Sequence, residues 1–180
     1  MDWQNWQTPL LVTAIVFAAF MVFRFRPVIS VDGRVSAAAL KEAKKKIVAA
    51  KDDAARAAAL CDAADASVKL GRISSAVTFY LRALRAAPGS REIASRAASG
   101  LARRHAALEK VMWRQLANAH FGESPESREA AVVALRALSA SYAKRPRFHP
   151  RSRAIENILE ALGEKPSPRA SQHAPPPSRD

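Results

Sequence analysis

The stretch of residues 57–90 limits the possible folds of this chain more than any other part of it. It contains two alanine-rich segments, each long enough for a helix, which are separated by Leu-Gly-Arg at 70–72 and followed by Pro-Gly at 88–89. A glycine between two helical segments and a proline after the second are typical of a helical hairpin. Because two helices cannot cover all of their own apolar surface, we expect the neighbouring segments to pack against this hairpin.

The composition indicates an all-α fold. Alanine supplies 39 of the 180 residues, and hydrophobic residues make up 49% of the chain. Alanine has the highest helix propensity, and runs of the β-branched and aromatic residues that favour strands are scarce after residue 35. Since an alanine side chain buries little area, we expect closely packed helices with few large anchoring residues.

The hairpin resembles a tetratricopeptide repeat, a 34-residue unit of two helices. That family has small residues where the two helices touch, an aromatic residue on the second helix and a closing proline. Counted from Ala57, the residues at these positions are Ala64, Gly71, Ala76, Tyr80, Ala83 and Pro88. The sequence departs from the family pattern at Leu60, Ala63 and Ser67, where the family usually has Trp, Leu and Tyr. The resemblance implies a domain of the α-solenoid type.

The resemblance also implies a surface for protein partners. In tetratricopeptide repeat proteins the first helix of each repeat lines a concave surface that binds peptides. The corresponding positions here are Cys61, Asp65, Val68 and Lys69. The alternative is that these side chains face solvent or pack against residues 36–51. The pattern does not continue over 91–124, because Lys110 and Arg114 occupy the small and aromatic positions and no turn is expected near His105. The sequence therefore predicts a single repeat.

The N-terminal residues are predicted to form a membrane anchor. Residues 10–23 are apolar except for one threonine; Trp3 and Trp6 precede them and Arg24 and Arg26 follow. A membrane-spanning helix needs about 20 residues, but tryptophans at the head groups and outward-reaching arginines could lengthen this shorter run. We expect a transmembrane helix within residues 1–26. The alternatives are a cleaved signal peptide and a buried core helix.

The charge distribution gives this anchor an orientation. Residues 1–9 carry one acid and no base, whereas residues 24–51 carry eight bases and two acids. Positively charged segments stay on the cytoplasmic side of a membrane. The sequence therefore predicts a single-pass protein of a bacterial inner membrane, with its N-terminus outside and the remaining chain in the cytoplasm. The only cysteine, Cys61, cannot form an intramolecular disulfide, which is compatible with that compartment.

These patterns divide the chain into four segments. They are the anchor at 1–26, a linker at 27–35, an α-helical domain at 36–163 and a Pro- and Ser-rich tail at 164–180 that is expected to be disordered. Within the domain, Ser36 is expected to cap a helix that begins at the next residue. Residues 91–119 contain no strong helix breaker and are expected to form one continuous helix.

The chain is strongly basic, with a net charge of +13, which favours anionic partners. Two groups of basic residues are interpreted as contacts to anionic lipid or another polyanion. They are Arg24, Arg26, Lys44, Lys45 and Lys46 in the first group and Lys144, Arg145, Arg147, Arg151 and Arg153 in the second. The alternative for both groups is an ordinary solvated surface. No nucleic-acid-binding motif accompanies them, although nucleic acid stays a possible partner.

The sequence contains no pattern that indicates catalysis. The four histidines are not spaced as metal ligands, and there is no phosphate-binding loop, dinucleotide-binding glycine motif or serine elbow. We therefore expect no enzymatic activity, no cofactor and no metal. The sequence predicts a membrane-anchored scaffold or adaptor that binds an unidentified protein through the hairpin. The alternatives are a membrane-associated nucleic-acid or polyanion-binding protein and a periplasmic or secreted repeat protein.

Overall fold

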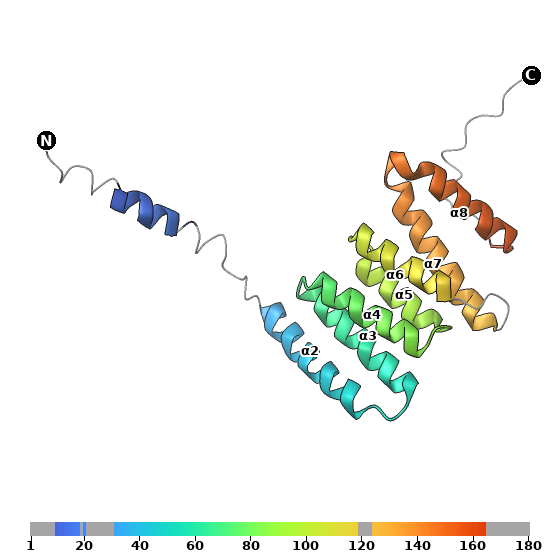
Figure 1. The fold of residues 1–180 in the computed structure, drawn as a ribbon, viewed down its shortest axis with the longest axis horizontal. Helices are drawn as coiled ribbons and strands as arrows, with labels where there is room; N and C mark the ends of the chain where they lie inside the picture. The colour runs from blue at the N-terminus through green and yellow to red at the C-terminus, as the bar shows by residue number, and fades with distance from the viewer. Residues whose placement is uncertain (1–9, 19, 21–30, 119–123, 165–180) are drawn as a thin grey trace, which may run out of the picture. The chain divides into compact units, whose positions relative to one another are not determined.

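The computed structural model describes residues 10–18, 20, 31–118 and 124–164 (Figure 1). Within these residues every regular element is a helix, so the predicted all-α fold is confirmed. The chain divides into two units, residues 1–35 and residues 36–180. The tail that was expected to be disordered lies outside the described residues, except for Glu164.

In the first unit, residues 10–18 and 20 are helical. No helix in the described parts of the chain combines the length and the apolar character that crossing a membrane requires. The predicted N-terminal transmembrane helix is therefore wrong, and so is the predicted single-pass location with the helical domain in the cytoplasm. The physical reason is length: a helix over the apolar residues 10–23 would be about 21 Å long, whereas the hydrocarbon core is about 30 Å thick.

Helix α2 (Val31–Ala49) begins earlier than the sequence suggested. The predicted linker at 27–35 and the predicted cap at Ser36 place the helix start after residue 36, but residues 31–35 are already helical. No proline interrupts residues 31–49, and the glycine at position 33 costs a helix interior only about 1 kcal/mol.

Helices α3 (Asp53–Lys69) and α4 (Ile73–Ala86) form a hairpin at the position that the sequence indicated. Asp52 caps α3, because its carboxylate accepts a hydrogen bond of 2.6 Å from the backbone N–H of Ala55. Gly71 in the turn has a φ of 72°, a left-handed conformation that glycine adopts without steric cost. A small apolar cluster joins the hairpin to α2: Leu40 and Ala43 of α2 pack against Ala63 and Ala66 of α3.

The predicted continuous helix at 91–119 is wrong, because a short turn divides it into α5 (Arg91–Leu101) and α6 (His105–Asn118). In the turn, the N–H of Ala102 donates to the carbonyl of Ser99 and the N–H of Arg104 donates to that of Leu101. These tighter bonds end α5 and allow α6 to fold back on it. The turn contains neither glycine nor proline, so only the packing of two separate apolar faces marks its position.

The third hairpin consists of α7 (Pro125–Ala143) and α8 (His149–Ala161), joined through the short 3₁₀ helix η1 (Pro146–Phe148). Ser124 caps α7, as the Ser-Pro-Glu sequence predicts, by accepting a hydrogen bond of 3.1 Å from the N–H of Ser127.

The three hairpins lie side by side in the order of the sequence (Figure 1). Their first helices, α3, α5 and α7, contact one another in succession, and α4 contacts α6. A single cluster of buried apolar side chains runs through all three hairpins. Each hairpin therefore covers apolar surface that its neighbour leaves open. This agrees with the expectation that neighbouring segments pack against the first hairpin.

Candidate functional site

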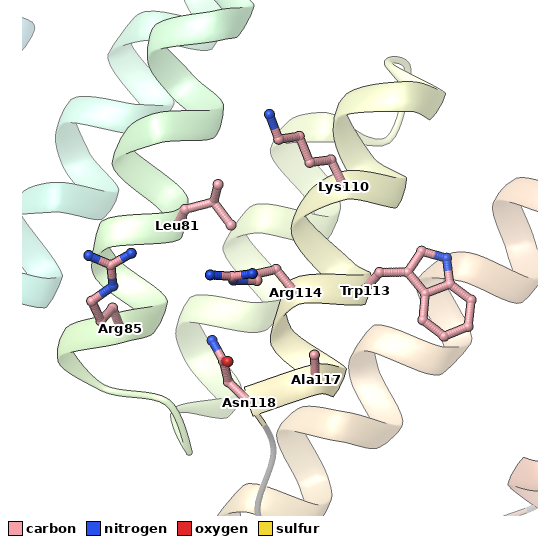
Figure 2. A pocket seen from close by; sticks show the side chains of 7 residues that line it. All are labelled: Leu81, Arg85, Lys110, Trp113, Arg114, Ala117 and Asn118. Atoms are coloured by element: carbon pink, nitrogen blue, oxygen red, sulfur yellow. The ribbon is translucent and has the colours of Figure 1, made fainter.

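A hollow of about 530 Å³ opens between α4 and α6, the second helices of the first two hairpins. It is lined by Leu81 and Arg85 of α4 and by Lys110, Trp113, Arg114, Ala117 and Asn118 of α6. Figure 2 shows the side chains of Arg114 and Asn118 directed from α6 toward α4, whereas the indole of Trp113 points toward α7. We call this hollow the α4/α6 groove.

The α4/α6 groove carries three cations and no acid. Arg85, Lys110 and Arg114 are exposed, and among the described residues none of them has an ion-pair partner. Lys110 and Arg114 are one helical turn apart on α6, so both project from the same side of that helix. Three positive charges that face a shared hollow without a counter-charge repel one another and attract an anion.

Apolar side chains lie between these cations. Leu81 is half-buried and packs against the main core, and Ala117 contributes a short side chain from the opposite wall. The groove can therefore accept an apolar group of a ligand beside its charged groups, which is the usual combination in binding sites.

Trp113 connects the groove to the third hairpin. Trp113 is 46% exposed, and its indole N–H donates a hydrogen bond of 3.1 Å to the Tyr142 hydroxyl. That hydroxyl donates in turn to Glu109 at 2.6 Å. Burial, together with the hydrogen bond to Glu109, raises the pKa of Tyr142. These bonds fasten α6 to α7 and thereby hold one wall of the groove in place.

Ser141, His105 and Glu109 combine the residue types of a nucleophile, a base and an acid. The Nδ1 atom of His105 lies 2.6 Å from the Ser141 hydroxyl, and Nε2 lies 3.6 Å from the Glu109 carboxylate. Ser141 is buried within α7, where backbone N–H groups bond to the preceding turn and cannot stabilise an oxyanion. The arrangement therefore ties α6 to α7 and gives no support for catalysis.

The surface that the resemblance implied for protein partners is largely occupied by internal contacts. Cys61 is 0% exposed, and burial raises the pKa of its thiol to about 12. Asp65 accepts hydrogen bonds from the Tyr80 hydroxyl and from Arg96, and Val68 is half-buried. The structure therefore removes Cys61 from this surface. Of the residues predicted there, Lys69 is the exposed one.

The residues that the resemblance assigned to repeat packing lie in two environments. Four of them are 0% exposed: Ala64, Ala76, Tyr80 and Ala83. Gly71 and Pro88 are exposed in the turns that follow α3 and α4. The carbonyl of Pro88 accepts a hydrogen bond of 2.6 Å from the buried amide of Gln115, which links the end of α4 to α6.

The predicted polyanion contacts do not form one site in the described residues. Lys44, Lys45 and Lys46 are exposed on α2, and Lys45 pairs with Glu42. The second group surrounds η1, where the guanidinium groups of Arg147 and Arg151 lie 4.8 and 5.4 Å from the centre of the Phe148 ring. The members of this group are all exposed: Lys144, Arg145, Arg147, Arg151 and Arg153. Arg24 and Arg26 lie outside the described residues. The interpretation as lipid contacts depended on the anchor and has lost that support.

Sequence reasoning missed the α4/α6 groove. Lys110 and Arg114 appeared only as departures from the repeat pattern, and Arg85 had no assigned role. Their helical spacing was visible, but the turn that brings α6 beside α4 was not.

No group of three or more His, Cys, Asp or Glu side chains in the described part of the chain is arranged to hold a metal ion. In comparisons with protein families, curated proteins and solved structures, nothing matches this chain.

Proposed function

We propose that this protein is a helical scaffold that binds an anionic segment of a partner protein in the α4/α6 groove. One observation carries the proposal: Arg85, Lys110 and Arg114 face a shared hollow without an acid among its lining residues. Some basic side chains elsewhere in the same domain are neutralised, as Arg91 is by Glu129 and Arg136 is by Glu164. A ligand with negative charges would supply what the groove lacks.

The resemblance of residues 57–90 to a tetratricopeptide repeat supports a role in protein binding. We place the partner on the second helices instead of the first, because the internal bonds of Asp65 and the burial of Cys61 leave little of the first surface accessible.

An acidic protein segment fits the groove better than a nucleic acid does. Proteins that bind single strands combine cations with aromatic rings on which bases stack. Arg147 and Arg151 lie over an aromatic ring, that of Phe148, but this ring is outside the groove. At the groove itself, the indole of Trp113 points away from the cations (Figure 2). The groove itself offers aliphatic surface from Leu81 and Ala117.

A binding assay with defined ligands tests the proposal. Fluorescence anisotropy would compare a labelled glutamate-rich peptide with a labelled single-stranded oligonucleotide of equal charge. We expect the peptide to bind the unmodified protein and the double variant Arg85→Gln, Arg114→Gln to bind it at least 10-fold more weakly. Arg72→Gln is the matched control, because it removes an exposed arginine that lies outside the groove and outside the surface predicted from the resemblance.

Two results would contradict this function. One is that the groove variant and the control variant change the affinity for the peptide by the same factor. The other is tighter binding of the oligonucleotide, with loss in the groove variant, which would assign the groove to nucleic acid.

A further inference from the structure

We infer that the α4/α6 groove selects an extended segment in which an apolar residue stands between two acidic residues. This inference rests on the proposed function and specifies the chemistry of the partner at the same site. It follows from the spacing of the lining residues along the two helices.

The cations on α6 match the side-chain repeat of an extended chain. Lys110 and Arg114 are four residues apart, which is about 6 Å along a helix. In an extended segment, side chains on one face recur every second residue, at about 6.6 Å. Acidic side chains at positions i and i+2 can therefore meet Lys110 and Arg114 without a change in either backbone.

The opposite wall explains the residue between the two acids. The side chain at position i+1 of an extended segment points away from α6 and toward α4. Leu81 and Arg85 are one turn apart on α4, and Figure 2 shows Leu81 toward the Lys110 end of the groove and Arg85 toward the Asn118 end. An apolar side chain at i+1 would thus meet Leu81.

An extended ligand can use both walls of the hollow at once. Its side chains alternate between two faces of the backbone, so one set can meet α6 while the other set meets α4.

Two peptides of identical composition test the inference. The first alternates glutamate and leucine (Glu-Leu-Glu-Leu-Glu-Leu), and the second separates them into blocks (Glu-Glu-Glu-Leu-Leu-Leu), each within the same flexible, labelled flanks. We expect the alternating peptide to bind about 10-fold more tightly than the block peptide. Lys110→Gln and Arg114→Gln should each weaken the alternating peptide about 5-fold, the upper range for an exposed ion pair, and Arg72→Gln should leave its affinity unchanged.

The outcomes separate this inference from the proposed function. Equal affinity for both peptides, reduced in both by the groove variants, would overturn the alternating register and leave the groove as a site for acidic protein segments. Affinities that no groove variant changes would overturn both proposals. Tighter binding of a helix-forming peptide with glutamates four residues apart would overturn the extended conformation. Circular dichroism of each variant excludes unfolding as the cause of any loss.

Discussion

Helix α4 takes part in two junctions that differ in their charged side chains: in one, acids and bases are paired, and in the other, the charged side chains are all basic. Toward α3 and α5, Tyr80 belongs to a closed network: its hydroxyl donates to Asp65, and Arg96 donates to Asp65 at 2.5 Å and to Asp62 at 2.7 Å. Toward α6, the next residues of the same helix, Leu81 and Arg85, face two further cations and no acid.

The contrast separates residues that stabilise the stack from residues available to a ligand. In the first junction each charged group has its partner within the protein, so substitution there should lower the free energy of unfolding. In the α4/α6 groove the like charges cost stability, so substitution there should change binding and leave folding intact. The predictions below test this division, beginning with the largest expected effect.

Tyr80→Ala should destabilise the domain most. Tyr80 is 0% exposed, and removal of a fully buried aromatic side chain costs about 3–5 kcal/mol because it leaves a cavity. Urea unfolding followed by circular dichroism measures the change. Tyr80→Phe keeps the ring and removes the bond to Asp65, so it should cost less, about 1–2 kcal/mol. An equal cost for both variants would show that the ring itself contributes little at this junction.

Gly100→Ala should be the next largest change. A Cβ atom at position 100 would overlap the Tyr80 hydroxyl, so the ring or α5 must shift. Overpacking of this kind costs about 1–3 kcal/mol. The cost should fall when the substitution is made in Tyr80→Phe, because that background lacks the overlapping oxygen. A double-mutant cycle measures this coupling, and strict additivity would contradict the contact.

Alkaline pH should lower the stability of the helix stack through the buried thiol of Cys61. Burial raises the pKa of the Cys61 thiol from 9.0 to about 12. A raised pKa means that the folded state keeps a proton that the unfolded state releases, so stability is complete below pH 9 and declines between pH 9 and 12. Urea midpoints measured across this range should fall, and they should fall less in Cys61→Ala. An equal decline in both proteins would exclude the thiol as the cause.

The sequence predicted the first junction much better than the groove. The glycine in the turn, the small residues and Tyr80 are local signals within residues 57–90, and they indicate a hairpin with an aromatic residue on its second helix. Arg96 was not predicted as the partner of Asp65, because it lies on α5 and meets α3 only after the hairpins stack. A charged residue in a sequence does not reveal whether a distant element will neutralise it.

The groove depends on a feature that local patterns do not record. The turn before His105 contains no glycine or proline, so the segment resembles one long helix, and on a single helix Lys110 and Arg114 would not face Arg85. The anchor prediction failed for a different reason. Its apolar run was real, but the estimate of its length relied on flanking residues.

The smallest expected effect on stability belongs to the groove itself. Arg85→Gln together with Arg114→Gln removes two like charges from exposed side chains, so the free energy of unfolding should change by no more than about 0.5 kcal/mol. Any change should be a gain at low salt, because repulsion between the cations is relieved, and it should vanish at 1 M salt, where the screening length is about 3 Å. Urea unfolding at low and high salt measures both quantities, with Arg72→Gln as the control. A loss of more than 1 kcal/mol would show that these arginines stabilise the stack, as Arg96 does, and would remove the distinction between the two junctions of α4.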